Sequence, residues 1–257
     1  MGAIKVAPTL RKENSMPRFF VDKEKIIGNT VVITDEDALH ISRSLRMRVG
    51  ESLTLSDGEG CDYECEITAF TKDSVELAVV SSKESDCEMP VEITLFQGVP
   101  KGDKMDLIVQ KAVECGASRI VPVEMKNCIV KLGDSADKKV ARWQRIADEA
   151  AKQSQRGRLV RVEMPIRYDE ALDLARKDDI SFICYEAEDE KSLSKVLSKD
   201  AKTLSFVIGP EGGFDPAEVK KANECGIPAV SLGKRILRTE TASMFTLAAL
   251  SMYFELL

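Results

Sequence analysis

One stretch of the chain constrains its fold more than any other. Residues 206–216 read FVIGPEGGFDP, a short apolar strand followed directly by a glycine-rich turn and the start of a helix. Asp215 is a good N-cap, Pro216 suits the first helical position, and Glu218 completes a capping-box pattern. Small ligands bind where parallel strands end in such turns. This segment therefore predicts an α/β fold with a small-molecule site beside the turn.

A second loop of the same kind follows. Residues 230–242 read VSLGKRILRTETA, again a short apolar strand, a polar loop and the start of an apolar helix. In the first loop, Gly209, Gly212 and Gly213 lack a Cβ and tolerate positive φ, so backbone amides there can approach a ligand. The spacing matches neither GxxxxGK(S/T) nor GxGxxG, which excludes the common nucleotide-binding loops. Either loop alone fits an ordinary strand–helix connection, but two in succession favour a binding site.

The composition describes a soluble globular protein. The 257 residues are 44% apolar and 31% charged, enough for one large domain or two modest ones. No apolar run is long enough to span a bilayer, and the N-terminus lacks a signal-peptide core. We therefore expect a cytoplasmic protein without a membrane partner.

Cysteine and histidine usage argues against metal and nucleophilic chemistry. The seven cysteines are odd in number, form no CxxC motif, and accompany a single histidine, His40. No metal site is therefore expected, and the cysteines are interpreted as reduced thiols. Because no nucleophile motif surrounds His40, a Ser–His–Asp or Cys–His arrangement is not expected either.

Basic charge is concentrated in two places on an acidic chain. The formal net charge is −6, yet residues 138–161 contain eight basic side chains and two acidic ones. The acid-free stretch over residues 38–50 contains Arg43, Arg46 and Arg48. Such patches suit contacts with phosphates. Residues 138–161 alone also fit an ordinary solvated helix face, but the two patches together favour RNA as a partner.

The hydrophobic pattern predicts two domains. Residues 1–15 form a short polar extension for which disorder is expected. Residues 16–85 contain short, often alternating strands and are interpreted as a small β-barrel. One short helix is expected to begin near Asp35 and to carry His40, Arg43 and Arg46.

The rest of the chain has a different pattern. Residues 81–90 are polar and are interpreted as a linker. Over residues 90–257 strands alternate with helices, which predicts a parallel sheet covered by helices on both faces. The later predicted helices span residues 137–155, 169–177, 215–225 and 240–256, and the strands between them span residues 181–185, 204–208 and 229–232.

Several motifs resemble the RsmE family of RNA methyltransferases, within the SPOUT superfamily. The most specific are GPEGGF at residues 209–214 and LGKRILRTETA at residues 232–242. Upstream, four further segments match the family in order and at sensible spacing: MPRFF at 16–20, HISRSLRMRVG at 40–50, QGVPKGDKMD at 97–106 and QKAVECG at 110–116. The resemblance therefore covers residues 16–257.

The resemblance implies a fold and an activity. The fold is a PUA-like RNA-binding barrel followed by a SPOUT domain with a trefoil knot, which ordinary sequence reasoning would not predict. The activity is methylation of N3 of a specific uridine in 16S ribosomal RNA of the small subunit, with S-adenosylmethionine as the methyl donor. Two alternatives are a SPOUT enzyme acting on another RNA site and a non-catalytic RNA-binding assembly factor. The MPRFF block argues against the first, and the intact donor motifs argue against the second.

The resemblance also implies a homodimer formed across the knotted domain. The helix expected at the end of the chain is apolar nearly all round, so every side of it must be covered. A partner subunit is one possible cover and internal burial is the other. The sequence leaves both open.

The motifs assign residues to the donor site and to RNA. The donor-binding residues are expected to be Glu186, Gly209, Glu211, Gly212, Gly213, Leu232, Gly233, Ile236, Leu237, Arg238, Thr241 and Ala242. The predicted RNA contacts are Arg18, Arg43, Arg46 and Arg156. One departure from the family pattern is Lys152, where an acid is expected, and it bears on RNA contact rather than on donor binding.

Methylation of uracil N3 requires removal of a proton, so a base or an anion-stabilising cation is needed. Arg238 is the candidate for stabilising the uracil anion, and Glu211 or Glu240 is the candidate proton acceptor. Both glutamates also fit a structural role in which they hold loop amides.

Overall fold

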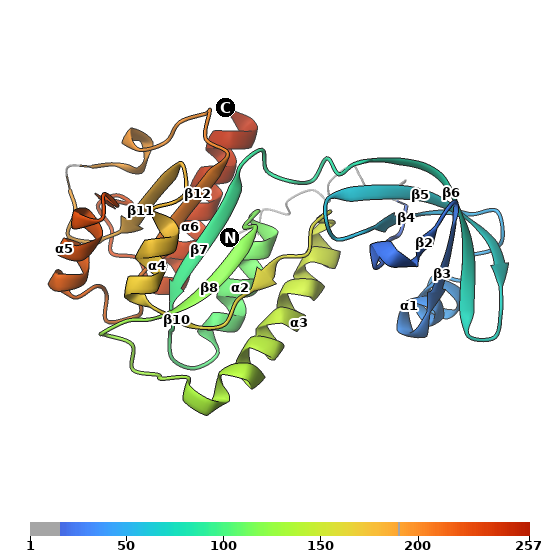
Figure 1. Ribbon diagram of the computed structural model, residues 1–257, viewed down its shortest axis with the longest axis horizontal. Helices are drawn as coiled ribbons and strands as arrows, with labels where there is room; N and C mark the ends of the chain where they lie inside the picture. The colour runs from blue at the N-terminus through green and yellow to red at the C-terminus, as the bar shows by residue number, and fades with distance from the viewer. Residues whose placement is uncertain (1–15, 190) are drawn as a thin grey trace, which may run out of the picture. The chain divides into compact units, whose positions relative to one another are not determined.

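The computed structural model describes residues 16–189 and 191–257 and divides the chain into two compact units (Figure 1). The first unit ends at Asp86 and the second begins at Cys87, inside the segment interpreted as a linker. The extension expected at residues 1–15 lies outside the described residues. Within the described ranges, no helix is both long and apolar enough to cross a membrane.

The first unit is built on one curved sheet. Its strands, within the described residues, are β1 (Arg18–Phe20), β2 (Ile26–Ile27), β3 (Thr30–Thr34), β4 (Ser52–Ser56), β5 (Cys61–Phe70) and β6 (Ser74–Glu84). They lie in the order β1-β4-β5-β6-β3-β2, with β1 parallel to β4 and the other described ladders antiparallel. Register shifts in the β5–β6 ladder bend these two long strands. The sheet therefore curls around its core.

Alternation of side chains builds this core. In β3, Val31 and Ile33 are buried while the three residues between and beside them are exposed. The largest buried side chains of the unit are Phe19, Ile41, Leu53, Leu55, Ile67 and Leu77. Because β6 continues to Glu84, the linker begins later than its polar composition suggests.

The short helix of this unit ends earlier than the sequence predicts. Helix α1 spans Asp35–Leu39 and continues through a wider turn over His40–Ser44. Arg43 therefore lies on the helical segment, but Arg46 lies beyond it, with a positive φ of 54°. Ile41 is fully buried and ties this segment to the sheet.

The second unit is a parallel sheet with helices between its strands. The described strands are β7 (Glu92–Gly98), β8 (Arg119–Glu124), β9 (Arg161–Val162), β10 (Ile166–Arg167), β11 (Ile180–Cys184), β12 (Thr203–Ile208) and β13 (Ala229–Val230). They pair in the order β10-β8-β7-β12-β11-β13, with β9 also on β8, and these ladders are all parallel. The predicted parallel α/β sheet is confirmed.

The helices of the second unit agree closely with the predicted ranges. They are α2 (Lys104–Glu114), α3 (Ala136–Ser154), α4 (Tyr168–Ala175), α5 (Pro216–Glu224) and α6 (Thr239–Ser251). The difference is at the end of α6, where a wider turn over Met252–Leu256 replaces the last part of the predicted helix.

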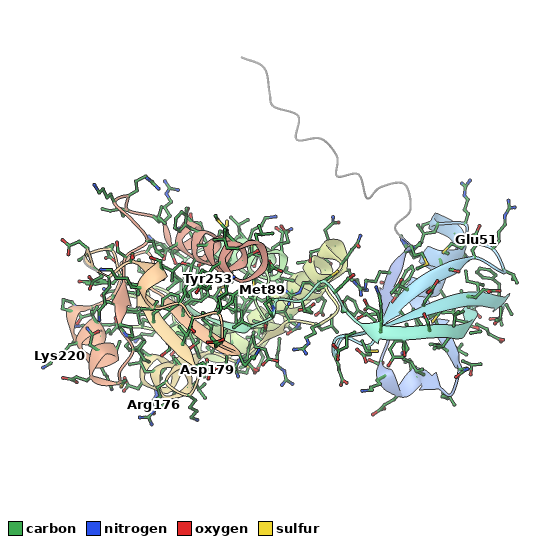
Figure 2. All side chains as sticks on the ribbon, turned by 90° about the horizontal axis from the view of Figure 1, so that it is seen from above. Glu51, Met89, Arg176, Asp179, Lys220 and Tyr253 are labelled. Atoms are coloured by element: carbon green, nitrogen blue, oxygen red, sulfur yellow. The ribbon has the colours of Figure 1, made fainter. Side chains whose placement is uncertain are left out.

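Helices cover both faces of this sheet, and their side chains fill the layers against it (Figure 2). On one face, α4 and α5 pack against alternate strand residues, among them Phe96, Ile183 and Val207. Neighbouring strand residues point the opposite way, where α6 lies against β12 and α2, and α2 lies against α3. This arrangement is consistent with the trefoil knot that the resemblance implies.

Arg156, a predicted RNA contact, is buried inside the second unit, with 4% of its side chain exposed. Its guanidinium donates to both carboxylate oxygens of Glu88 at 2.6–3.1 Å and to the carbonyls of Val113 and Ala117 at 2.8 and 3.1 Å. Gln155, which precedes it, adopts a left-handed conformation with φ 60° that ends α3 and turns the chain. The prediction for Arg156 is therefore wrong, because this residue fastens the start of the second unit to the end of α3.

We expect Arg156→Met to lower the free energy of unfolding by about 3–5 kcal/mol, because the carboxylate of Glu88 then stays buried without its partner. Urea denaturation measures this loss. Arg158→Met is the matched control, since the ion pair of Arg158 with Glu92 is 45% and 63% exposed at its two ends. Loss of such a pair costs less than about 1 kcal/mol. Equal losses in the two variants would contradict a structural role for Arg156.

Candidate functional site

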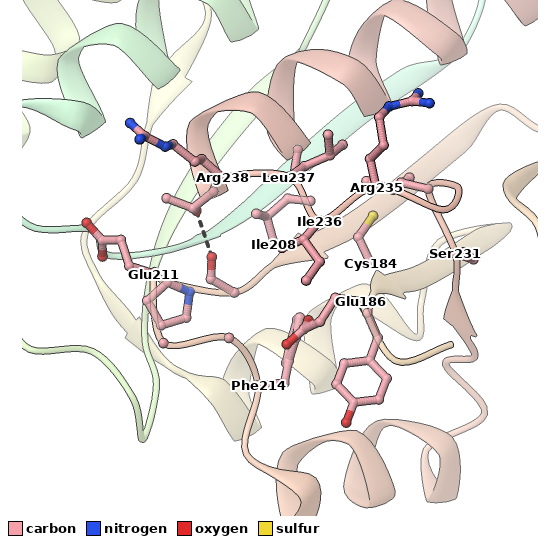
Figure 3. Close-up of a pocket in the computed structure, with 18 of the residues that line it drawn as sticks. Cys184, Glu186, Ile208, Glu211, Phe214, Ser231, Arg235, Ile236, Leu237 and Arg238 are labelled. Atoms are coloured by element: carbon pink, nitrogen blue, oxygen red, sulfur yellow. Dashed lines mark hydrogen bonds between the residues drawn. The ribbon is translucent and has the colours of Figure 1, made fainter. Parts of the chain in front are cut away.

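A pocket of about 510 Å³ opens in the second unit, at the carboxyl ends of β11, β12 and β13 (Figure 3). This is the edge at which open parallel sheets bind ligands, and the volume is in the range of small-molecule sites. Residues 184–186 after β11, residues 208–214 after β12, and the loop between β13 and α6 line it. The two loops singled out from the sequence therefore form opposite walls of one pocket.

Most of the predicted donor-binding residues lie in the wall of this pocket. They are Glu186, Gly209, Glu211, Gly212, Gly213, Leu232, Gly233, Ile236, Leu237, Arg238 and Ala242. Thr241 does not line the pocket and is exposed on α6. Thr239 lines it instead, because it stands at the first helical position and faces Gly209.

The glycine turn uses its conformational freedom at one of its three glycines. Gly213 has a positive φ of 66°, whereas Gly209 and Gly212 do not. A Cβ on Gly213 would lie 2.6 Å from Oε1 of Glu186. The absent side chain therefore lets the carboxylate of Glu186 approach the backbone of the turn.

Side chains from the loop after β8 hold this turn from outside. The amide of Asn127 donates to the carbonyls of Gly212 and Gly213 at 3.1 and 3.2 Å. A Cβ on Gly212 would lie 3.0 Å from the Cβ of Asn127, so the side of Gly212 that would carry a side chain faces this support. The sequence did not indicate Asn127, because its partners lie 85 and 86 residues away along the chain.

Helix α5 begins as the sequence predicts. The carboxylate of Asp215 accepts a hydrogen bond from the amide of Ala217 at 3.0 Å, and the amide of Asp215 donates to Glu218 at 2.9 Å. Lys126 lies 2.6 Å from the same aspartate, and its hydrogen bond lowers the pKa of Asp215. The predicted capping box is confirmed, and it fixes the far end of the glycine turn.

The second wall carries an uncovered apolar side chain. Gly233 has a φ of 106° and begins the loop, which then runs past the pocket to α6. Ile236 is 87% exposed although it is aliphatic, and it lies among the pocket residues in Figure 3. An apolar group bound here would cover this surface.

A buried polar network joins both walls to the end of β7. The hydroxyl of Thr239 donates to the carbonyl of Gly209 at 2.7 Å and accepts from Nε2 of Gln97 at 2.9 Å. The hydroxyl of Ser243 donates to Oε1 of Gln97 at 2.5 Å. Figure 3 marks the bond that crosses from α6 to the glycine turn. Sequence reasoning missed Gln97 and Ser243, because no local pattern links positions 142 to 146 residues apart.

A lysine and two glutamates form a charged cluster at one end of the pocket. Nζ of Lys104 lies 2.8 Å from Oε1 of Glu211 and 3.9 Å from Oε2 of Glu240. Glu211 also accepts a hydrogen bond from the amide of Lys101 at 3.1 Å. Burial opposes ionisation of Glu211, but the hydrogen bonds from Lys104 and from backbone amides outweigh it and lower the pKa of this carboxyl. Glu211 is therefore an ionised carboxylate that ties the glycine turn to Lys101 and to Lys104, at the start of α2.

Glu240 is bonded differently. Its Oε2 atom is buried and accepts no hydrogen bond from the described residues, although Lys104 is nearby. Glu240 does not itself line the pocket, but its neighbours Arg238 and Thr239 do. Arg238 is exposed at the start of α6. Lys104 was not among the predicted site residues, because 107 residues separate it from Glu211 in the sequence.

The remaining predicted RNA contacts lie in the first unit. Arg18 forms an ion pair with Asp62, and the two side chains are only 9% and 6% exposed. The prediction that Arg18 grips a phosphate is therefore wrong, because its charge is used inside the barrel. Arg43 and Arg46 are exposed, so their contact with RNA stays a prediction.

Comparisons with known proteins agree with both units. A model of the RNA methyltransferase domain matches residues 87–251, and a model of the RNA methyltransferase PUA domain matches residues 33–80. The chain is 35% identical over 252 residues to ribosomal RNA small subunit methyltransferase E of Bacillus subtilis, covering 94% of this chain and 98% of that one.

Solved structures give the same result. The ribosomal RNA small subunit methyltransferase E of Neisseria gonorrhoeae, bound to S-adenosyl methionine, is 37% identical, with a TM-score of 0.82 and coverage of 93% and 98%. A methyltransferase of Legionella pneumophila with bound SAM is 29% identical, with a TM-score of 0.79 and the same coverage.

We expect Thr239→Val to lower the free energy of unfolding by about 1–3 kcal/mol, because it leaves buried polar groups of Gln97 and Gly209 without a partner. Thermal or urea unfolding measures the change. Thr241→Val, an exposed change two residues along the same helix, is the matched control and should stay within about 0.5 kcal/mol of the parent. If both variants unfold like the parent, the network does not stabilise the site.

Proposed function

The chain belongs to the family of ribosomal RNA small subunit methyltransferases E, and we propose that it transfers the methyl group of S-adenosylmethionine to N3 of a uridine in 16S ribosomal RNA. The observation that carries this proposal is the pocket at the carboxyl edge of the parallel sheet, whose walls are the GPEGGF turn and the loop over residues 232–238. The matched relatives cover nearly the whole chain and are named as methyltransferases of small-subunit ribosomal RNA, and one of them is bound to S-adenosyl methionine.

The residues of the pocket fit the donor chemically. The exposed side chain of Ile236, with Ile208 and Leu237, offers apolar surface for an adenine ring. The carboxylate of Glu186 lies against Gly213 in the pocket wall. Its negative charge would attract the positively charged sulfonium of the donor to this side of the pocket.

The bound donor supplies an electrophilic methyl group, so the chain must supply position and a route for one proton. Well-aligned reactants gain roughly 7–11 kcal/mol from position alone. We assign acceptance of the N3 proton to Glu240 rather than Glu211, because Glu211 is engaged by Lys104 and by a backbone amide whereas Oε2 of Glu240 accepts no hydrogen bond from the described residues. Arg238, exposed in the pocket wall, is assigned the role of stabilising the negative charge that develops on the uracil.

The proposal extends to the partners and the compartment. Arg43 and Arg46 of the barrel are proposed to contact RNA phosphates. We place the reaction in the cytoplasm, where ribosomal RNA is the substrate. No group of three or more His, Cys, Asp or Glu side chains suited to a metal occurs among the described residues, and the proposed chemistry uses none.

A homodimer through α6 is also proposed. The sheet covers one side of this helix, where Leu247 and Leu250 are fully buried. Phe245 on this helix is 41% exposed, and Met252, in the turn that follows it, is 53% exposed. Internal burial therefore accounts for part of the apolar helix, and a second copy would cover the remainder by an isologous contact.

The test of the function is methylation of small-subunit ribosomal RNA by the purified protein and labelled S-adenosylmethionine. Mass mapping of the RNA should place the methyl group on N3 of one uridine. A methyl group on a ribose would instead favour a SPOUT enzyme with another RNA site. Donor binding without any transfer, to naked RNA or to assembled subunits, would favour a non-catalytic assembly factor.

We expect Gly213→Ala to weaken binding of S-adenosylmethionine by at least about tenfold, because the new Cβ needs a positive φ and displaces the Glu186 carboxylate. Titration calorimetry measures the affinity. Gly226→Ala is the matched control, since Gly226 has a φ of 81° but no atom within 4 Å of an added Cβ. It carries the same backbone cost and should leave the affinity unchanged, so equal losses in both variants would point to general destabilisation.

We expect Glu240→Gln to slow methyl transfer by about 100- to 10,000-fold at neutral pH while leaving donor affinity within about threefold, as for loss of a general base. The rate of the variant should then rise by about tenfold per pH unit, because solution ionisation of the uracil replaces the missing base. Single-turnover rates against pH measure both effects. Glu211→Gln should instead weaken donor binding. A Glu240→Gln profile that parallels the parent would remove Glu240 from proton transfer.

A further inference from the structure

The outward side of α3 carries a line of basic side chains that the donor site does not use. At 3.6 residues per turn, four positions fall on one face of this helix, directly opposite the buried residues Trp143 and Ala147. We name them the α3 basic stripe: Lys138, Arg142, Arg145 and Lys152. All four are exposed, and they span about 21 Å along the helix axis at 1.5 Å per residue.

Like charges follow one another over the first two turns of the stripe. Arg142 pairs with Asp106 of α2 and lies 3.7 Å from Asp103. Lys138 and Arg145 make no ion pair with any described residue of the chain. Exposed helices are usually stabilised by opposite charges three or four residues apart, whereas Lys138, Arg142 and Arg145 repeat the same sign at this spacing. Glu149 is the acid that shares this face, between Arg145 and Lys152.

The net charge of this segment is opposite in sign to that of the rest of the chain. Residues 138–161 hold eight basic and two acidic side chains, so the remaining chain holds 29 basic and 41 acidic ones out of the totals of 37 and 43. The buried pair of Arg156 with Glu88 removes one of these eight from the surface. Of the other seven, Arg142 and Arg158 pair with Asp106 and Glu92 at the surface. The segment still holds more basic than acidic side chains, so it attracts polyanions, whereas the rest of the chain carries a net negative charge and repels them.

We propose that the α3 basic stripe is a second RNA-binding surface, one that grips the phosphate backbone of the RNA substrate from the methyltransferase unit itself. This inference rests on the proposed function, since it names a further contact with the same substrate. With a length of about 21 Å, the stripe is long enough to contact several successive phosphates of one strand. Contacts of this kind position the RNA and do not read its sequence.

The composition of the surface favours RNA over an acidic protein. Protein interfaces depend on buried aromatic or aliphatic anchors, whereas nucleic-acid interfaces are polar and strongly positive. None of the large apolar side chains exposed in the described chain lies on α3. The stripe therefore offers charge without an anchor, as a phosphate backbone requires.

The test is the salt dependence of binding to full-length small-subunit ribosomal RNA, measured with the double variant Lys138→Ala/Arg145→Ala of the whole chain. Each lost phosphate contact should reduce the slope of log K against log salt by about 0.7–0.9 and the affinity by about fivefold at 0.1 M salt. The double variant should thus bind about 25-fold more weakly. Its affinity for S-adenosylmethionine should equal that of the parent.

The matched control is Lys220→Ala/Lys221→Ala on α5, two exposed cations of the same unit that lie near Glu224 and Asp169. This control should keep the parent slope. An unchanged slope for the α3 variant, or tighter binding of the parent to polyglutamate than to the RNA, would overturn the inference. Because the readout is RNA binding, failure of the methylation assay would count against the proposed function and not against the stripe.

Discussion

The site depends on the buried contact between Thr239 and Gly209. This hydrogen bond joins the first residue of α6 to the first residue after β12. Nε2 of Gln97, near the end of β7, donates a second hydrogen bond to the same Thr239 hydroxyl. Buried polar groups cost free energy unless they are hydrogen-bonded. The start of α6 and the ends of β12 and β7 therefore stabilise one another only when they are packed together. The two walls of the pocket are consequently fixed at the point where they converge.

Paired polar side chains also hold the outer rim of the pocket. Asn127 and Lys126, both from the loop after β8, bind the glycine turn and the cap of α5. Glu211 binds back to Lys104 and to the amide of Lys101. The turn is thus held by side chains on its outer side, while its residues 209–214 line the pocket on the other. A loop held in this way loses little conformational entropy on binding, which is how preorganised sites gain affinity.

The sequence predicted those features that short segments determine. The capping box at Asp215, the extent of α3 and the loops that form the pocket all follow from neighbouring residues, and the structure agrees with them. The errors concern burial and contacts between distant segments. Arg156 and Arg18 look like surface cations in the sequence, but each meets a carboxylate that the fold brings from 68 and 44 positions away. Lys104 and Gln97 lie in the QGVPKGDKMD segment that resembles the family, but that segment alone does not show that the two side chains reach Glu211 and Thr239.

The distribution of charge determines where this acidic chain can bind a polyanion. A uniformly basic protein would bind any RNA along its whole surface, whereas an acidic chain binds only where its local sign is reversed. Two elements that carry several exposed basic residues are the segment around Arg43 in the barrel and the outer side of α3. Like-charge repulsion elsewhere disfavours wrong orientations, so the acidic surface contributes to specificity while the cations contribute affinity. Phosphate contacts of the proposed kind would orient the RNA substrate, and this orientation would help to decide which base reaches the methyl group.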